Sequence, residues 1–318
     1  MLAVVAGLKN TNVFELVSRK MIGLFHTRRA VIYSLVFGTF FFDMIVANDM
    51  SLITFLPLTY IVLHSTKNDK YLAFTFIMQT IAANMGGMIT PYGNPQNLYL
   101  YSHYNIPTGE FFGILFLQTI TVAVLLYICC AFIKNEELTL EKSSEIAINK
   151  GKVYVYVVLF VLVILTIFRL IPYLVTFFIV LLTILLTDRK IFKQVDYPLL
   201  ATFFVFFVFS GNIARIPAIK SFIAGIVEKN VLIAGIISCQ FISNVPTAIF
   251  LSKFTANYRD LLVAVNIGSL GILISSLASL ITLKEFLKHQ PKNFGKYLAM
   301  YTFFNTLFLV ILLVVTSL

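Results

Sequence analysis

The feature that most constrains the fold is the stretch 71–104, YLAFTFIMQTIAANMGGMITPYGNPQNLYLYSHY. It contains no Lys, Arg, Asp or Glu, so it can enter the hydrocarbon of a membrane. Its middle is nevertheless unsuited to a helix, because glycine weakens helices and proline removes a backbone donor. The residues responsible are Gly86, Gly87, Pro91, Gly93 and Pro95. The pattern predicts a helix to about Met85, unwound chain to about Pro95 and a short second helix from Gln96.

Polar side chains surround this predicted break: Asn84, Thr90, Asn94, Gln96 and Asn97. Non-helical backbone at membrane depth is tolerated only where protein or a water-filled cavity satisfies its polar groups. An interrupted apolar segment is the best sequence indication of a transporter's binding site. The alternative is a proline-kinked structural helix, but the density of amides and hydroxyls favours a site.

Composition places the chain in a bilayer. Of 318 residues, 59% are hydrophobic and 12% charged, with a mean hydropathy of +0.92. These values exclude a soluble domain and predict an all-α polytopic membrane protein, expected in the plasma (inner) membrane. The net charge of +10 lies largely in short loops, where it signals orientation and contact with anionic lipid rather than nucleic acid. Three cysteines lack disulfide or metal spacing, so we expect no bound metal or cofactor beyond a coupling ion such as Na⁺.

Residues 30–64 are predicted to form a re-entrant hairpin. One continuous helix here would span roughly 50 Å at about 1.5 Å per residue, too much for a single crossing. Basic residues flank the stretch on both sides, which places both ends on the cytoplasmic side. The chain would therefore turn near Asn48-Asp49 and return. Two full crossings with a tight outer turn are the alternative.

The two halves of the chain resemble each other. AANMGGMITPYGNPQNL (82–98) aligns without gaps with AVNIGSLGILISSLASL (264–280), and the tip at 47–51 aligns with 243–247. With the predicted topology, this order indicates an inverted repeat with a site at the midplane. We expect a first repeat at 1–133 that begins before Met1, with its broken helix at 71–104, a linker with connecting helices at 134–197, and a second repeat at 198–318 with a hairpin at 219–257, a broken helix at 260–283 and an external C-terminus.

At these residues the sequence resembles the ion transporter superfamily, specifically its citrate-transporter-like and divalent anion–sodium symporter group. Arsenite permeases and one class of sodium–proton antiporters are relatives of that group. The motifs are AANMGGMITPYGNPQNLYLY (82–101), ISNVPTAIFL (242–251) and ANDMSLITFLPL (47–58). The resemblance implies two re-entrant hairpins meeting two broken helices, a homodimer and elevator-type alternating access. Dicarboxylate members carry Ser-Asn-Thr at both tips, whereas here each tip keeps only part of that triplet.

The candidate site residues follow from the chemistry that an anion and a cation require. Helix N-termini near Asn97 and Thr247 offer free N–H groups to an anion. Unwound carbonyls and asparagine side chains offer oxygen to Na⁺, so each tip with its broken helix would form one cation site, with substrate between the two. The expected substrate contacts are Asn48, Thr90, Asn94, Asn97, Ser243, Asn244, Thr247 and Ser276. The expected cation contacts are Asp43, Asn48, Asp49, Asn84, Gly86, Gly93, Asn244 and Asn266.

Asp43 and Asp49 are the carboxylates deep in a predicted apolar segment. Intramembrane acids are functional by default, as proton carriers or cation ligands. For Asp49 an equal alternative is a cap on the returning helix arm.

These features predict a secondary active transporter, in which Na⁺ or H⁺ drives a small anion, either a di- or tricarboxylate or an inorganic oxyanion. The alternatives within transporters are Na⁺/H⁺ antiport and arsenite-type metalloid efflux. An enzyme is disfavoured because the sequence has no H-E-x-x-H or G-x-S-x-G motif. A passive channel and a membrane scaffold are further rivals, and the repeated hairpin tips and midplane amides argue against them.

Overall fold

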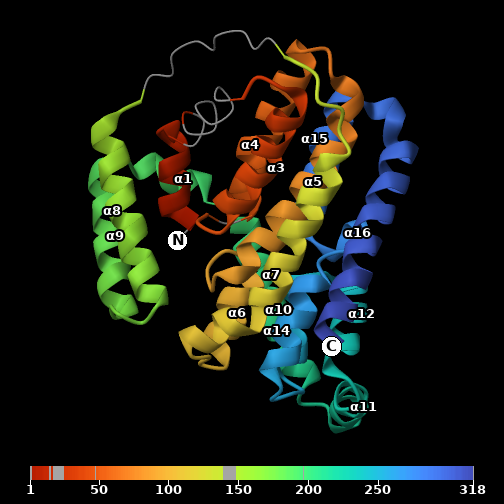
Figure 1. Ribbon diagram of the computed structural model, residues 1–318. Helices are drawn as coiled ribbons and strands as arrows, with labels where there is room; N and C mark the ends of the chain where they lie inside the picture. Colours follow the sequence, from red (N-terminus) through yellow and green to blue (C-terminus); the bar gives the residue numbers. More distant parts are fainter. Residues whose placement is uncertain are drawn as a thin grey trace. The chain divides into compact units, whose positions relative to one another are not determined.

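A computed structural model describes residues 2–13, 16, 25–46, 48–138, 148–195 and 197–317 (Figure 1). Within these ranges the chain is helical, and its extended pairing is limited to one bridge between Thr27 and Glu137. The predicted all-α membrane fold is confirmed. In the part of the chain that the structure describes, four helical stretches are long and apolar enough to cross a membrane by length and composition: Asp69–Ile89, Thr108–Ala131, Lys150–Ile167 and Pro291–Ser317. A fifth is formed if Ser221–Val227 and Val231–Ile242, bent by 114°, count as one span.

The chain divides into two compact units, and the smaller comprises residues 1–24 and 141–202. It contains α1 (Leu2–Asn10), α8 (Lys150–Ile167), α9 (Tyr173–Thr187) and the 3₁₀ helix η3 (Arg189–Gln194). Helix α1 lies close against α8, because a Cβ added at Gly7 would be 2.2 Å from the Tyr156 ring. Helix α10 (Tyr197–Ile213) begins in this unit and ends in the other.

The larger unit comprises residues 25–140 and 203–318 and holds every candidate site residue. Its first helices are α3 (Arg28–Asp43), α4 (Asn48–Ser65), η1 (Asp69–Tyr71), α5 (Leu72–Gly86), η2 (Gly87–Ile89), α6 (Pro95–His103) and α7 (Thr108–Ala131). Its later helices are α11 (Pro217–Val227), α12 (Val231–Ile242), α13 (Asn244–Leu251), α14 (Tyr258–Ile267), η4 (Leu273–Ser275), α15 (Leu277–His289), η5 (Pro291–Asn293) and α16 (Phe294–Ser317).

Helices α3 and α4 form a packed helix pair where the first hairpin is predicted. The turn falls between Asp43 and Asn48, and Ala47 of the predicted tip lies outside the described residues. Gln79 of α5 ties both arms to the interrupted helix: its Nε2 donates to Thr39 Oγ1 at 3.1 Å, and its Oε1 accepts from Thr59 Oγ1 at 3.0 Å. All three side chains are fully buried. These bonds fix the pair against α5.

Both predicted helix interruptions are present. Helix α5 ends at Gly86 and α6 begins at Pro95, with only the 3₁₀ turn η2 between them. In the second half, α14 ends at Ile267 and α15 begins at Leu277. No proline breaks this second helix; Gly271 does so with a φ of +108°, which an L side chain rarely adopts. Helix α15 runs on to His289, past the predicted end of the segment near residue 283.

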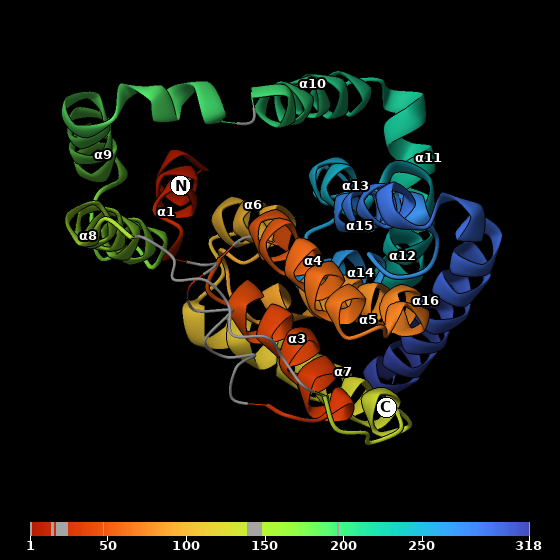
Figure 2. The ribbon, with the colours of Figure 1, turned by 90° about the horizontal axis from the view of Figure 1, so that it is seen from above.

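The helix pairs around the two breaks pack alike. The first arm of each pair packs on the first half of its own interrupted helix: α3 on α5, and α12 on α14. The returning arm packs on the second half of the other interrupted helix: α4 lies beside α15, and α13 beside α6 (Figure 2). The two interrupted helices are therefore held together by arms from both halves of the sequence.

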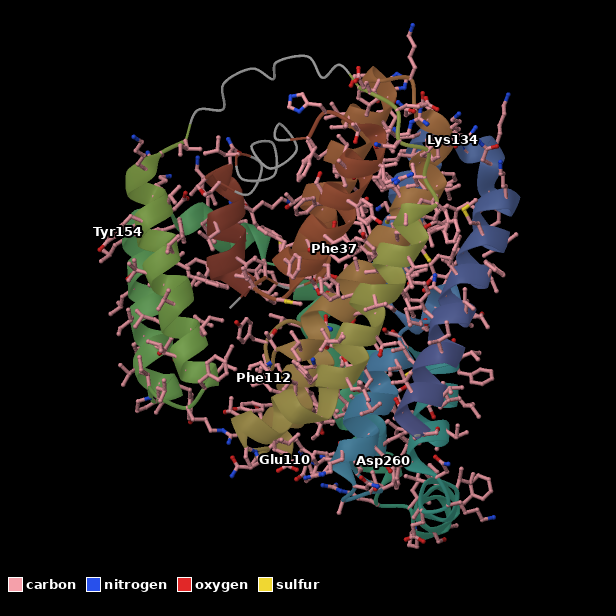
Figure 3. The ribbon with its side chains drawn as sticks, in the orientation of Figure 1. Phe37, Glu110, Phe112, Lys134, Tyr154 and Asp260 are labelled. Carbon is pink, nitrogen blue, oxygen red and sulfur yellow. The ribbon has the colours of Figure 1, made fainter. Side chains whose placement is uncertain are left out.

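Ion pairs lie near both ends of the larger unit. Arg259 at the start of α14 contacts Glu110 of α7 at 2.6 Å, and Tyr258 donates to the same carboxylate at 2.8 Å. Figure 3 shows Glu110 and Asp260 at one end of the larger unit and Lys134 at the opposite end. At that opposite side, Arg28 pairs with Glu136 and donates to the Tyr71 hydroxyl.

Candidate binding site at the two interrupted helices

The carbonyls released by the first break meet one amide group. Asn97, in the first turns of α6, is fully buried, and its Nδ2 donates to the carbonyls of Gly87, Met88 and Thr90 at 3.4, 3.0 and 3.3 Å. Unpaired buried carbonyls are costly, so the unwound chain would be unstable without this amide. The predicted site residue Asn97 therefore acts first on the protein's own backbone.

Thr90 and Gly93 shape the same loop. Thr90 Oγ1 donates to the carbonyl of Met44 at 3.2 Å and accepts from the Gly93 N–H at 3.1 Å. A Cβ at Gly93 would lie 2.3 Å from the Gly87 carbonyl, so only glycine allows this close approach. Gly86 serves packing in a similar way, because a Cβ there would lie 2.3 Å from the Phe40 carbonyl of α3.

Asp43 and Asn94 present unpartnered oxygens beside the break. Asp43 is the last residue of α3 and is fully buried; its Oδ2 accepts from the Gly87 N–H at 2.6 Å, and its Oδ1 has no hydrogen-bond partner. Asn94 is also buried; its Nδ2 donates to the Asn84 carbonyl at 3.2 Å, and its Oδ1 has no partner. Both side chains face Gly87, because a Cβ there would lie 2.4 Å from Asp43 Oδ2 and 3.1 Å from Asn94 Oδ1.

Reciprocal hydrogen bonds join the two interrupted helices. Ser276 Oγ donates to Asn84 Oδ1 at 2.7 Å, and Asn266 Nδ2 donates to Asn97 Oδ1 at 2.7 Å. Gln96 Nε2 adds a bond of 3.3 Å to Asn266 Oδ1. All five side chains are buried. Asn84 Nδ2 remains a buried donor without a partner. The predicted residues Asn84, Asn97, Asn266 and Ser276 thus form two hydrogen-bonded pairs between the interrupted helices.

The second tip bonds mainly to itself and to its own break. Ser243, with a φ of 70°, donates from Oγ to the Ser275 carbonyl at 3.3 Å. Asn244 Oδ1 accepts from the Val245 N–H at 2.9 Å, and Thr247 Oγ1 donates to the Ser243 carbonyl at 2.7 Å. Asn244 and Thr247 are buried. These bonds hold the turn between α12 and α13 in shape.

Asn48 and Asp49 lie at the start of α4. Asn48 is buried and Asp49 is half-buried in the first turn. A carboxylate at this position is favoured by the helix dipole, as the capping alternative requires. The charge of Asp49 also acts on Asp43. Both interpretations of Asp49 therefore stay open.

Two residues at the breaks were missed by the sequence reasoning. Gly87 supplies the N–H that binds Asp43, and its missing side chain leaves room for Asp43 Oδ2 and for the unpartnered Asn94 Oδ1. Gln240 of α12 donates from Nε2 to the carbonyls of Gly268 and Leu270 at 2.9 and 3.0 Å and accepts from the Ile272 N–H at 3.1 Å. The signal for Gln240 was available, since it is the one amide side chain in the apolar run 231–242. In the described parts of the chain, no group of three His, Cys, Asp or Glu residues could hold a metal ion.

Comparison with known proteins adds independent information. A family model described as "Citrate transporter" matches residues 1–282. "Uncharacterized transporter MJ0456" of Methanocaldococcus jannaschii is 31% identical over 301 residues, which cover 92% of this chain and 79% of that protein. "Inner membrane protein YbiR" of Escherichia coli is 25% identical over 282 residues, covering 87% of this chain and 75% of the relative.

Proposed function

This chain belongs to the citrate transporter family, and from that premise we propose that it couples the movement of a small anion to Na⁺ or H⁺ by alternating access. It is an integral membrane protein, and its family and its relative from Methanocaldococcus jannaschii are described as transporters rather than enzymes. The coupling ion, the solute and the access mechanism are the content of the proposal.

The observation that carries the proposal is the pair of unpartnered oxygens beside the first break. A buried carboxylate with one oxygen unpaired costs several kcal/mol unless a cation or proton neutralises it. The carboxylate oxygen Asp43 Oδ1 and the amide oxygen Asn94 Oδ1 both lack a partner, and the two side chains approach Gly87, Asp43 with its other oxygen, Oδ2. A cation that prefers oxygen, or a proton shared with the carboxylate, removes that cost. We therefore assign the coupling ion to this place, with Asn94 as a cation contact rather than a substrate contact.

The anion is assigned to the neighbouring donors. Asn84 Oδ1 is taken by Ser276, so its remaining free group is the Nδ2 donor, which suits an anion better than a cation. Ser276 also caps α15, a helix of 13 residues, by accepting from the Ala278 N–H at 3.2 Å. The positive end of that helix favours negative charge. A di- or tricarboxylate or an inorganic oxyanion fits this chemistry.

Three further expectations complete the proposal. The resemblance to divalent anion–sodium symporters supports a homodimer that works by an elevator motion. Helix α3 packs on α5 as α12 packs on α14, and this similarity supports an inverted repeat. Basic loops support a plasma membrane location with an external C-terminus.

Flux in proteoliposomes tests the proposal. Purified protein would be reconstituted and given radiolabelled citrate or succinate, with and without an inward Na⁺ or proton gradient. We expect accumulation that depends on one of the gradients and on the protein. No gradient-driven uptake of any carboxylate or oxyanion, combined with Na⁺-driven proton movement in the absence of anion, would favour the antiport alternative. Arsenite extrusion would favour metalloid efflux.

A further inference from the structure

In both breaks, a side-chain amide nitrogen donates hydrogen bonds to backbone carbonyls that the interruption of the helix leaves unpaired. In the first, Asn97 Nδ2 lies among three carbonyl oxygens of residues 87–90. In the second, Gln240 Nε2 lies among the carbonyls of Gly268, Leu270 and Ile236 at 2.9, 3.0 and 3.2 Å. Converging carbonyls are the ligands that a Na⁺ ion would use, and in both breaks an N–H₂ group already occupies their focus. The released carbonyls therefore need no cation in either half.

The two halves of the chain differ in the polar atoms that remain without a hydrogen-bond partner. In the alignment of the two tips, residue 43 falls on 239, so Gln240 lies one position from the counterpart of Asp43. Gln240 is neutral, and both its oxygen and its nitrogen are hydrogen-bonded to the second break. Asn244 Oδ1 at the second tip is likewise engaged by the Val245 N–H. Within the described residues, Asp43 is the one carboxylate with a buried oxygen that lacks a partner.

We propose that the protein has a single coupling-ion site, formed by Asp43 and Asn94 in the first half, and that the amide of Gln240 stands in the place of a second ion. This inference rests on the proposed function and sharpens it to one ion per transport cycle. The ion is a monovalent cation or a proton. The other carboxylate at this tip is Asp49, in the first turn of α4.

Ion-dependent unfolding tests the inference without any solute. The full chain in detergent would be unfolded thermally across a series of NaCl concentrations, with choline chloride holding ionic strength constant, at two pH values. At saturation, stabilisation rises with the logarithm of ligand concentration in proportion to the number of ions bound. For wild type we expect the slope of one Na⁺ or, if Na⁺ has no effect, a pH dependence that differs from that of Asp43→Asn by one proton. Asp43→Asn should abolish that slope.

The complementary experiment uses a variant that is designed to gain a second ion site. Gln240→Glu removes both amide donors from the Gly268 and Leu270 carbonyls and adds a carboxylate beside them. We expect the Na⁺ slope to double approximately in this variant. Gln118→Glu, in α7, where the side chain bonds to Thr316 of α16, is the matched control and should leave the slope unchanged. If Asp43→Asn does not fold, Asn94→Ala replaces it and should weaken the apparent ion affinity about tenfold.

Three results would overturn the inference. One is a two-ion slope in wild type. Another is an ion response that survives Asp43→Asn or Asn94→Ala and is lost when Gln240 is changed. The third is identical Na⁺ and pH responses in wild type and Asp43→Asn. Because no solute is present, a one-ion slope together with absent anion flux would reject the proposed function and keep the single site.

Discussion

At the residue scale, the site depends on side chains that satisfy backbone groups and on others that are left unsatisfied. Asn97 belongs to the first kind, and Asp43 and Asn94 to the second. Under the proposed function, residues of the first kind stabilise the fold and those of the second kind bind the coupling ion. The sequence reasoning grouped all of them as ligands, because an amide's partner is invisible in the residue order.

Replacing Asn97 with Leu should destabilise the protein strongly. The change keeps the side-chain size and removes the donor shared by three buried carbonyls, each of which costs about 1–3 kcal/mol when unsatisfied. We expect a clearly lower thermal unfolding midpoint and loss of uptake. The exposed Asn293→Leu serves as the control, and equal midpoints for the two variants would contradict this role of Asn97.

Replacing Gly87 with Ala should act on the ion and leave the fold largely intact. The new methyl group would lie 2.4 Å from Asp43 Oδ2 and 3.1 Å from Asn94 Oδ1, so both oxygens must shift. We expect the apparent affinity for the coupling ion in uptake assays to fall about tenfold or more. Gly109→Ala meets nothing within 4 Å and should change nothing. Unaltered ion dependence in the Gly87 variant would mean that the space beside this glycine is not the site.

At the element scale, the glycines and prolines of residues 86–95 were sufficient to place the first break, because their effect on a helix is local. The second break contains no proline, and only its alignment with the first indicated an interruption. The hydrogen bonds between the two breaks could not be predicted from the sequence, because the bonded residues are far apart in it. Asn97 and Asn266 are 169 residues apart, and Asn84 and Ser276 are 192 residues apart. The close approach of Gly86, a predicted cation contact, to the Phe40 carbonyl of another helix was hidden for the same reason.

Ser276 links the two interrupted helices and caps one of them, so Ser276→Ala should have two effects. Loss of the cap costs about 1 kcal/mol of stability. Loss of the bond to Asn84 frees an amide that the proposal places beside the anion. We expect a modestly lower unfolding midpoint and a several-fold higher KM for anion uptake, with the ion dependence kept. A change in midpoint alone would show that Ser276 acts only as a cap.

The contact between α3 and the segment after α7 should depend on pH. The hydrogen bond from Arg28 lowers the pKa of Glu136, so this pair stabilises the fold above the unfolded-state pKa and loses that effect as pH falls through the folded-state pKa. Glu136→Gln should therefore lower the unfolding midpoint near neutral pH and converge with wild type in acid. The effect is small because Glu136 is 55% exposed, and salt should weaken it. A constant difference at every pH would refute the assignment; Glu137→Gln is the control.

At the scale of the whole molecule, hydrophobicity and break position predict an all-α membrane transporter, and the family match agrees. The structural feature particular to this transporter is the packing between the two halves of the chain. Returning arms α4 and α13 each pack on the interrupted helix of the other half, so both breaks are held in one body (Figure 2). A solute bound there would contact both halves of the chain at once, as expected for a site at the interface of two repeats.

The most direct test of this account compares wild type and Asp43→Asn in the same proteoliposomes, measuring labelled-anion accumulation under an ion gradient and anion exchange without one. The account predicts that wild type shows both activities, and that Asp43→Asn keeps exchange but no longer accumulates anion against its gradient. Accumulation by Asp43→Asn equal to that of wild type would contradict it.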